Sequence, residues 1–119
     1  MNMNSMLEEL EQLSCESHEN SIYAASLAAI IANHEADKAD SMAKSAKSLE
    51  MVNFKDMGCP VTLAEHKART SENYKRFKSI AFDKRLNAEK AKARFQFLTM
   101  RRDTLKTRIS ALQSQMKIL

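Results

Sequence analysis

The residues of this chain that could do chemistry are cations at regular spacing in its C-terminal half. They form two rows with steps of seven or fourteen residues: Lys78, Arg85, Lys92 and Lys106, and Arg94, Arg101 and Arg108. Residues seven apart lie on the same face of a helix, so each row would run along one side of it. Rows of Lys and Arg can bind phosphates, and neighbouring aromatic rings can stack on unpaired bases. The aromatic residues in this region are Tyr74, Phe77, Phe82, Phe95 and Phe97.

Signals for catalysis or metal binding are weak. Cys15-x-x-His18 has a spacing found in metal sites, but two ligands do not make a site, and Cys59 with His66 is no stronger. We find no glycine-rich phosphate loop, no nucleophile with an orienting base and acid, and no pair of catalytic carboxylates. The sequence therefore predicts a protein that is not an enzyme, with no cofactor, no metal and no small-molecule substrate.

Charge is sorted along the chain. Residues 1–20 hold five acids and no Lys or Arg, residues 21–60 are close to neutral, and residues 61–119 carry a net charge of +10. An acidic head and a basic C-terminal half indicate a polyanionic partner, an internal electrostatic contact, or both.

Composition predicts an all-α fold in a single domain, residues 1–119. The chain has one Gly and one Pro, which leaves almost no residues for the turns that sheets require, while good helix formers dominate. We expect a long antiparallel helical hairpin of coiled-coil type, with a short acidic N-terminal helix over residues 1–19 that starts at the Ser5–Glu8 capping box. We also expect this hairpin to be oligomeric.

Two long helices should form that hairpin. The first, over residues 20–57, starts near Asn20 or Ser21 and ends at the Gly58-Cys59-Pro60 stop signal. Its seam alternates by four and three: Ala25, Ala29, Ala32, Ala36, Ala39, Ala43 and Ala46. The second, over residues 62–119, starts at the Thr62–Glu65 capping box and runs without a breaker to the C-terminus. Its mostly apolar seam has the same alternation from Thr70 to Leu119, as in coiled coils.

The second long helix is too long for the first to cover. Its last part must pack against the acidic N-terminal helix, a second subunit, or both. We therefore predict a homo-oligomer formed through Leu98, Leu105, Ile109, Leu112 and Met116.

The run from Leu98 to Ser114 resembles the C-terminal helix of small phage early proteins. The whole layout, with its acidic start Met6–Leu13 and two long helices around one break, is similar to the UvsY-type recombination mediators. This resemblance implies an all-helical protein that assembles into rings and binds single-stranded DNA. It also implies a role in loading a recombinase onto strands that are coated with single-strand binding protein.

The function predicted from these observations is non-enzymatic binding of single-stranded DNA, in support of a recombinase or annealing protein. The residues expected to contact DNA are Lys75, Lys78, Arg85, Lys92, Arg94, Arg101, Lys106 and Arg108. One alternative is a coiled-coil adaptor between proteins, a virion component or an inhibitor of a host defence complex; another is simply a solvated basic face. The sequence has no secretory signal and no apolar run of about 20 residues, so we expect the protein in the cytoplasm. If a phage encodes the chain, this is the cytoplasm of the host cell. The continuous seam argues against a helix that lies on a membrane surface.

Overall fold

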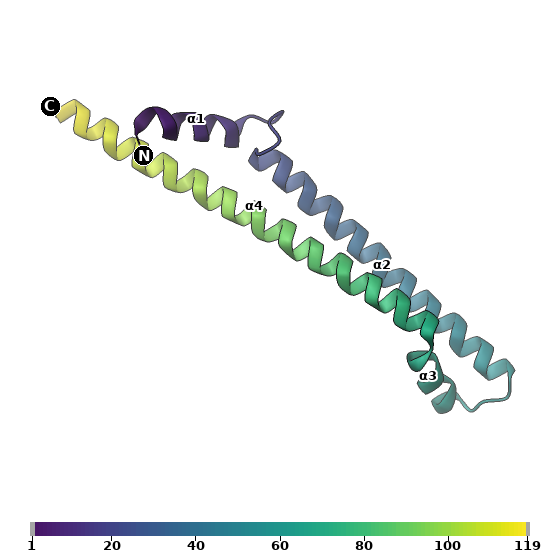
Figure 1. Ribbon diagram of the computed structural model, residues 1–119. Helices are drawn as coiled ribbons and strands as arrows, with labels where there is room; N and C mark the ends of the chain where they lie inside the picture. The colour runs from purple at the N-terminus through teal and green to yellow at the C-terminus, as the bar shows by residue number, and fades with distance from the viewer. Residues whose placement is uncertain (1, 119) are drawn as a thin grey trace. The chain divides into compact units, whose positions relative to one another are not determined.

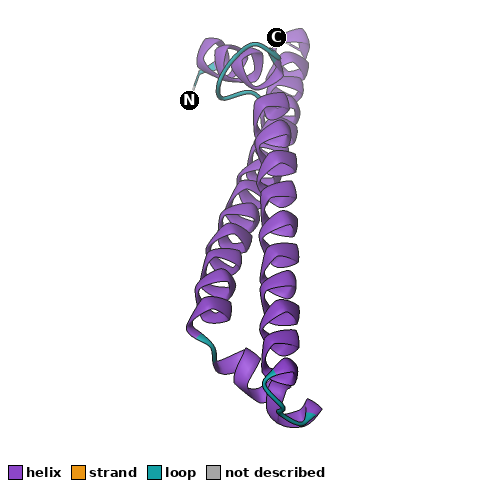
Figure 2. Cartoon of the chain, turned by 90° about the vertical axis from the view of Figure 1, so that its right-hand side faces the viewer, coloured by secondary structure: helices purple, strands orange, loops and turns teal. Residues whose placement is uncertain are grey.

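The computed structural model describes residues 2–118, which form four helices and no strand. The helices are α1 (Met3–Ser14), α2 (Ile22–Asp56), α3 (Val61–Thr70) and α4 (Glu72–Ile118), joined by short loops (Figures 1 and 2). The predicted all-α hairpin is confirmed. None of the described helices combines the length and the apolar character needed to cross a membrane.

Contacts divide the chain into two compact units. Unit 1 holds the described residues of Met1–Ile30 and Glu89–Leu119, and unit 2 is Ile31–Ala88. Helices α2 and α4 each contribute to both units. Leu119, the last position of the predicted seam, lies outside the described residues.

Side-chain caps set the starts of the first two helices. The Asn2 side chain accepts a hydrogen bond from the Ser5 backbone N–H at 2.8 Å, so α1 begins at Met3, earlier than the predicted Ser5 cap. The Ser21 hydroxyl accepts one from the Ala24 N–H at 3.0 Å, in agreement with the predicted start of α2. Each cap satisfies a backbone donor that has no partner inside the helix.

The predicted end of α2 is confirmed. Gly58 has φ +89°, a left-handed conformation that glycine adopts without a steric penalty. The Cys59 N–H donates to the Phe54 carbonyl at 3.1 Å, and the Gly58 N–H donates to the Lys55 carbonyl at 2.9 Å. This pair of hydrogen bonds is the Schellman arrangement that terminates helices at glycine.

The prediction of one uninterrupted helix over residues 62–119 is wrong at Ser71. Ser71 has an extended backbone (φ −66°, ψ 144°), and its hydroxyl donates to the Ala68 carbonyl at 3.0 Å and accepts from the Tyr74 N–H at 3.2 Å. One serine therefore ends α3 and caps α4. The predicted Thr62–Glu65 capping box is also not formed, because α3 begins one residue earlier, with Pro60 as a cap residue that makes no side-chain hydrogen bond.

The core of unit 1 lies between α1 and α4. Its buried members are Met6 and Leu13 from α1 and Leu105 and Ile109 from α4, and the partly buried residues around them are Met3, Leu10, Ile22, Leu98 and Leu112. Helix α1 therefore covers part of the α4 segment that α2 was expected to leave uncovered, as the sequence analysis allowed.

The core of unit 2 is made of alanine. Helices α2 and α4 run antiparallel, since Arg85 contacts Asn33 while Phe77 lies beside Leu49, closer to the loop end of the hairpin. Every buried apolar residue described in this unit is an alanine: Ala36, Ala39, Ala43, Ala46, Ala64, Ala68, Ala81 and Ala88. Of the five alanines that the predicted seam places in unit 2, Ala36, Ala39, Ala43 and Ala46 are buried and Ala32 is half-buried. In unit 1, Ala25 of the same seam is also buried.

Candidate nucleic-acid interface

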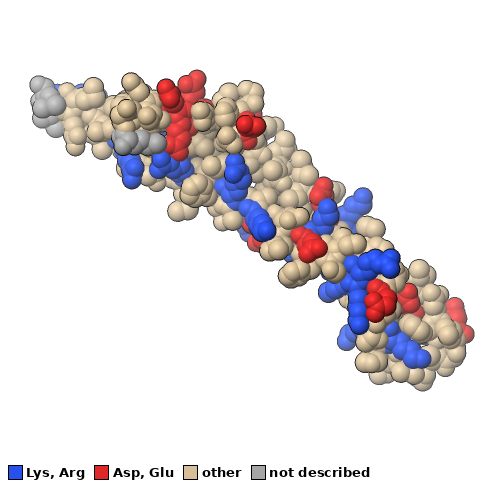
Figure 3. Space-filling view, in the orientation of Figure 1, with Lys and Arg blue, Asp and Glu red and all other residues tan. Residues whose placement is uncertain are grey.

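A groove in unit 2 collects several cations and two aromatic rings. It is a hollow of about 640 Å³ whose lining includes Asp40 of α2, Arg69 of α3, and Tyr74, Lys75, Lys78, Phe82 and Arg85 of α4. A second hollow of about 370 Å³ shares Asp40, Tyr74 and Lys78 with it and adds Lys44 and Lys47 of α2. We call these two hollows together the cationic groove. Figure 3 shows blue Lys and Arg side chains gathered over α3 and the start of α4.

Helical spacing brings the groove residues of α4 onto one side. Lys75, Lys78 and Phe82 follow one another at three and four residues, so their side chains are neighbours on the helix surface. Phe82 is 68% exposed, which is unusual for a side chain of this size and leaves its ring face open to solvent. Tyr74 is half-buried and borders both hollows.

The groove also contains cations that the sequence interpretation missed. Lys44 and Lys47 directly follow the seam residues Ala43 and Ala46 of α2, and this position beside the seam is the sequence signal that could have identified them. Lys47 and Arg69 share Glu65 as an ion-pair partner, at 3.7 and 2.6 Å. Lys44, Lys75 and Lys78 are exposed and have no ion-pair partner among residues 2–118.

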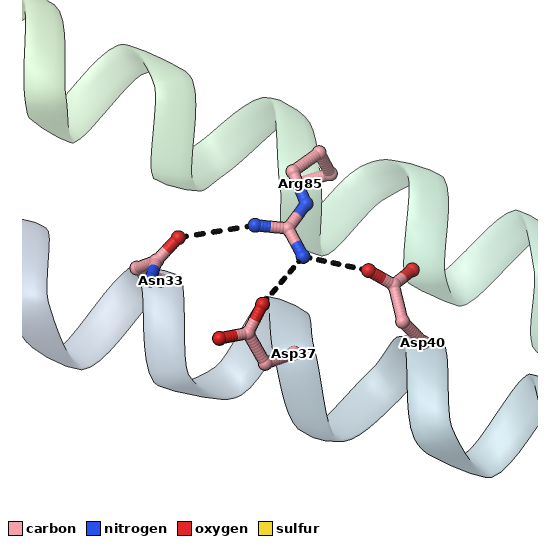
Figure 4. Close-up of polar contacts among 4 residues, drawn as sticks. All are labelled: Asn33, Asp37, Asp40 and Arg85. Atoms are coloured by element: carbon pink, nitrogen blue, oxygen red, sulfur yellow. Dashed lines mark hydrogen bonds and ion pairs between the residues drawn. The ribbon is translucent and has the colours of Figure 1, made fainter.

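Arg85 lines the groove but is held by α2. Its guanidinium donates hydrogen bonds to Asn33 Oδ1 at 3.0 Å, Asp37 Oδ1 at 2.8 Å and Asp40 Oδ2 at 2.6 Å (Figure 4). Asn33, Asp37 and Asp40 are spaced four and three apart, so they line one side of α2 and face the arginine together. The two carboxylates raise the pKa of Arg85. Arg85, which the sequence predicted to contact DNA, is therefore already engaged in polar contacts that link α4 to α2.

Two cations of the second predicted row are also engaged, within unit 1. Arg101 forms a two-pronged ion pair with Glu9 of α1, with Nε to Oε1 at 2.7 Å and Nη2 to Oε2 at 3.0 Å. Hydrogen bonding by Arg101 holds the pKa of the Glu9 carboxyl below its usual value. Arg94 donates to Asn20 Oδ1 at 3.2 Å. The acidic head thus meets the basic helix within the chain.

The remaining predicted cations of unit 1 are open to solvent. Lys92, Lys106 and Arg108 are exposed on α4, and none has an ion-pair partner in the described part of the chain.

Unit 1 contains eight Lys and Arg against seven acids, whereas unit 2 contains eleven against eight. Folding the acidic head onto α4 therefore leaves the larger positive excess in unit 2, where the cationic groove lies.

The cysteines and histidines do not form a metal centre in the described residues, where no three His, Cys, Asp or Glu side chains come close enough to hold an ion. Cys15 Sγ lies 3.3 Å from the Ser17 hydroxyl, and this hydrogen bond lowers the pKa of the thiol. His18 Nδ1 accepts a hydrogen bond from the Asn20 N–H at 3.0 Å, so the ring orders the loop between α1 and α2.

Comparison of the chain with models of protein families, with curated proteins and with solved structures found no significant match.

Proposed function

We propose that this protein binds single-stranded nucleic acid, with DNA as the expected ligand, in the cationic groove of unit 2 and without catalysing a reaction. The observation that carries the proposal is the placement of an exposed phenylalanine, Phe82, beside Lys75 and Lys78, two lysines without ion-pair partners. Phosphates attract the lysines, and an unpaired base can stack on the open ring.

The groove favours single strands over duplex DNA as its ligand. Stacking on Phe82 needs a base whose face is accessible, and bases in a duplex are already stacked on one another. Most of the polar groups that line the groove are charged ends of long side chains, which suit phosphates better than the edges of particular bases. We therefore expect binding with little sequence preference.

Asp40 and Glu65 limit how many cations reach phosphate. Asp40 borders the groove and pairs with Arg85, while Glu65 pairs with Lys47 and Arg69. Three lysines remain without partners: Lys44, Lys75 and Lys78. At about −0.7 per phosphate for a single strand, three contacts give a slope of roughly −2 for the logarithm of affinity against the logarithm of salt concentration.

The resemblance to recombination mediators extends the proposal to a partner. In that case the bound strand would be passed to a recombinase, and the protein would act by binding and remodelling. The alternative of an adaptor between proteins uses the same basic surface for an acidic protein. Binding of an oligonucleotide separates these two functions directly.

The test is fluorescence anisotropy with a labelled 30-mer of mixed sequence at low salt. We expect Lys75→Glu/Lys78→Glu and Phe82→Ala each to weaken binding at least tenfold, because they remove the phosphate contacts and the stacking surface. The matched control is Lys92→Glu/Lys106→Glu, which makes the same charge change on exposed lysines of α4 in unit 1 and should weaken binding less than threefold. Absence of binding by the wild-type chain would overturn the proposal in favour of the adaptor, and equal losses in the groove and control variants would overturn the assignment of binding to the groove.

A further inference from the structure

Unit 2 has small residues inside and large apolar residues outside. Its buried apolar side chains are all alanines, whereas Met42, Leu49, Val52 and Ile80 are exposed by 47%, 59%, 52% and 44%. Burying an alanine removes little more than one methyl group from water, and about half of the surface of these four larger side chains stays exposed within one chain. Such a distribution is typical of a surface that another chain covers.

Three of these exposed residues lie on one flank of the helix pair. Met42 and Leu49 are seven residues apart on α2, and together with Phe77 of α4 they line a hollow of about 570 Å³. Ile80 follows Phe77 by three residues and lies on the same side of α4. We call Met42, Leu49, Phe77 and Ile80 the apolar flank.

The apolar flank is separate from the cationic groove. Lys44 and Lys47 lie on one side of the alanine seam of α2, and Met42 and Leu49 lie on the other, as their helical spacing from Ala43 and Ala46 requires. The lining of the apolar hollow contains no acidic residue and one cation, Lys38, whereas that of the groove contains several cations. A molecule on the apolar flank would therefore leave the groove open.

We propose that the apolar flank is the surface through which two copies of this chain pair. The argument for a second copy is that the flank carries unpartnered charges of opposite sign on its two helices. Lys38 lies one turn before Met42 on α2, and Asp83 lies one turn after Ile80 on α4; neither has an ion-pair partner among the residues described. A two-fold pairing that sets α2 of one copy against α4 of the other brings Lys38 close to Asp83 of the partner subunit.

This pairing also completes the apolar core. Two antiparallel helix pairs packed through their apolar flanks make a four-helix arrangement, with the large side chains of both copies between the pairs. It differs from the self-association predicted through Leu105 and Ile109, which α1 buries within the chain. It does not depend on nucleic-acid binding.

The test is the mass of the full chain by sedimentation velocity over a range of concentrations. We expect wild type to reach twice the chain mass. Met42→Glu/Leu49→Glu and Met42→Lys/Leu49→Lys should each stay at the mass of one chain with unchanged helical circular dichroism, because both residues are exposed. Lys38→Glu and Asp83→Lys should each weaken pairing, and the two changes combined in one chain should restore it, because the exchanged charges again lie opposite each other between the copies.

The matched control is Phe97→Glu/Met100→Glu, which charges two exposed apolar residues of α4 in unit 1 and should leave the pairing intact. Four results overturn the proposal: a wild-type chain that stays single at every concentration, pairing that survives the charged substitutions, a control that dissociates equally, or an exchange of the Lys38 and Asp83 charges that does not restore pairing. If wild type stays single, the flank instead serves a different partner or none.

Discussion

Substitution of Leu105 by alanine tests whether the core of unit 1 holds α1 in place. Leu105 is fully buried (0% exposed) and packs in the cluster with Met6, Leu13 and Ile109. The change deletes three carbon atoms, worth about 0.8 kcal/mol each, for about 2.4 kcal/mol. The residual cavity raises the cost within a range of about 2–5 kcal/mol, and a short surface helix that can shift toward the cavity favours the lower end.

Loss of this packing should act on α1 first. A helix of 12 residues is marginal in water on its own, so α1 depends on docking against α4 for its structure. A cost of about 2.4 kcal/mol corresponds to a roughly 50-fold increase in the open population of α1. Hydrogen–deuterium exchange of peptides from α1 should accelerate by about that factor, while peptides from α2 in unit 2 should change little.

The control is Met116→Ala, which shortens a 66%-exposed side chain on the same helix. This variant should leave the exchange of α1 unchanged, because Met116 contributes little buried surface. If Leu105→Ala accelerates exchange in α1 no more than Met116→Ala does, the buried cluster does not hold the helix, and our assignment of the core is refuted.

Two further predictions concern an ion pair and a cap. Because Arg101 holds the pKa of Glu9 below its usual value near 4.5, the pair stabilises the folded state above that value and loses its effect as pH falls through the lowered pKa. The melting temperature of wild type should therefore exceed that of Glu9→Gln at pH 6, with the difference shrinking below about pH 4; a difference independent of pH would contradict the assignment. Ser71→Ala removes the hydroxyl that caps α4 and should cost about 1 kcal/mol in urea unfolding. Ser71→Asp should retain most of the stability because it keeps a capping oxygen, and equal stability of the alanine variant and wild type would show that the cap is not needed.

Local signals accounted for most of the secondary structure. Helix formers, the Gly58 stop and the alanine alternation of α2 each act over a few residues, so they can be recognised in a sequence. The break at Ser71 was missed because no Gly or Pro marks it. A serine can favour a helix end by bonding to nearby backbone groups, but whether it does so depends on the packing around it.

The candidate site was only partly predictable. Spacing put Lys78 in a row along one side of a helix, where the structure has it exposed, but it could not show that Arg85 and Arg101 were engaged elsewhere. Their partners lie 45 and 92 residues away along the chain, at Asp40 and Glu9. Helical periodicity describes the faces of one helix and contains no information about which face of another helix it meets.

The sequence by itself determined that the chain is helical, where α2 stops, and that its C-terminal half is basic, because these properties follow from residue type and short-range spacing. Only the tertiary structure decided which cations remain available and which apolar residues stay uncovered. Docking of α1 buried Leu105 and paired Arg101, and the alanine contact between α2 and α4 turned Met42 and Leu49 outward. Charge neutralisation and burial depend on distances between residues far apart in the chain, and those distances are set only when the helices pack.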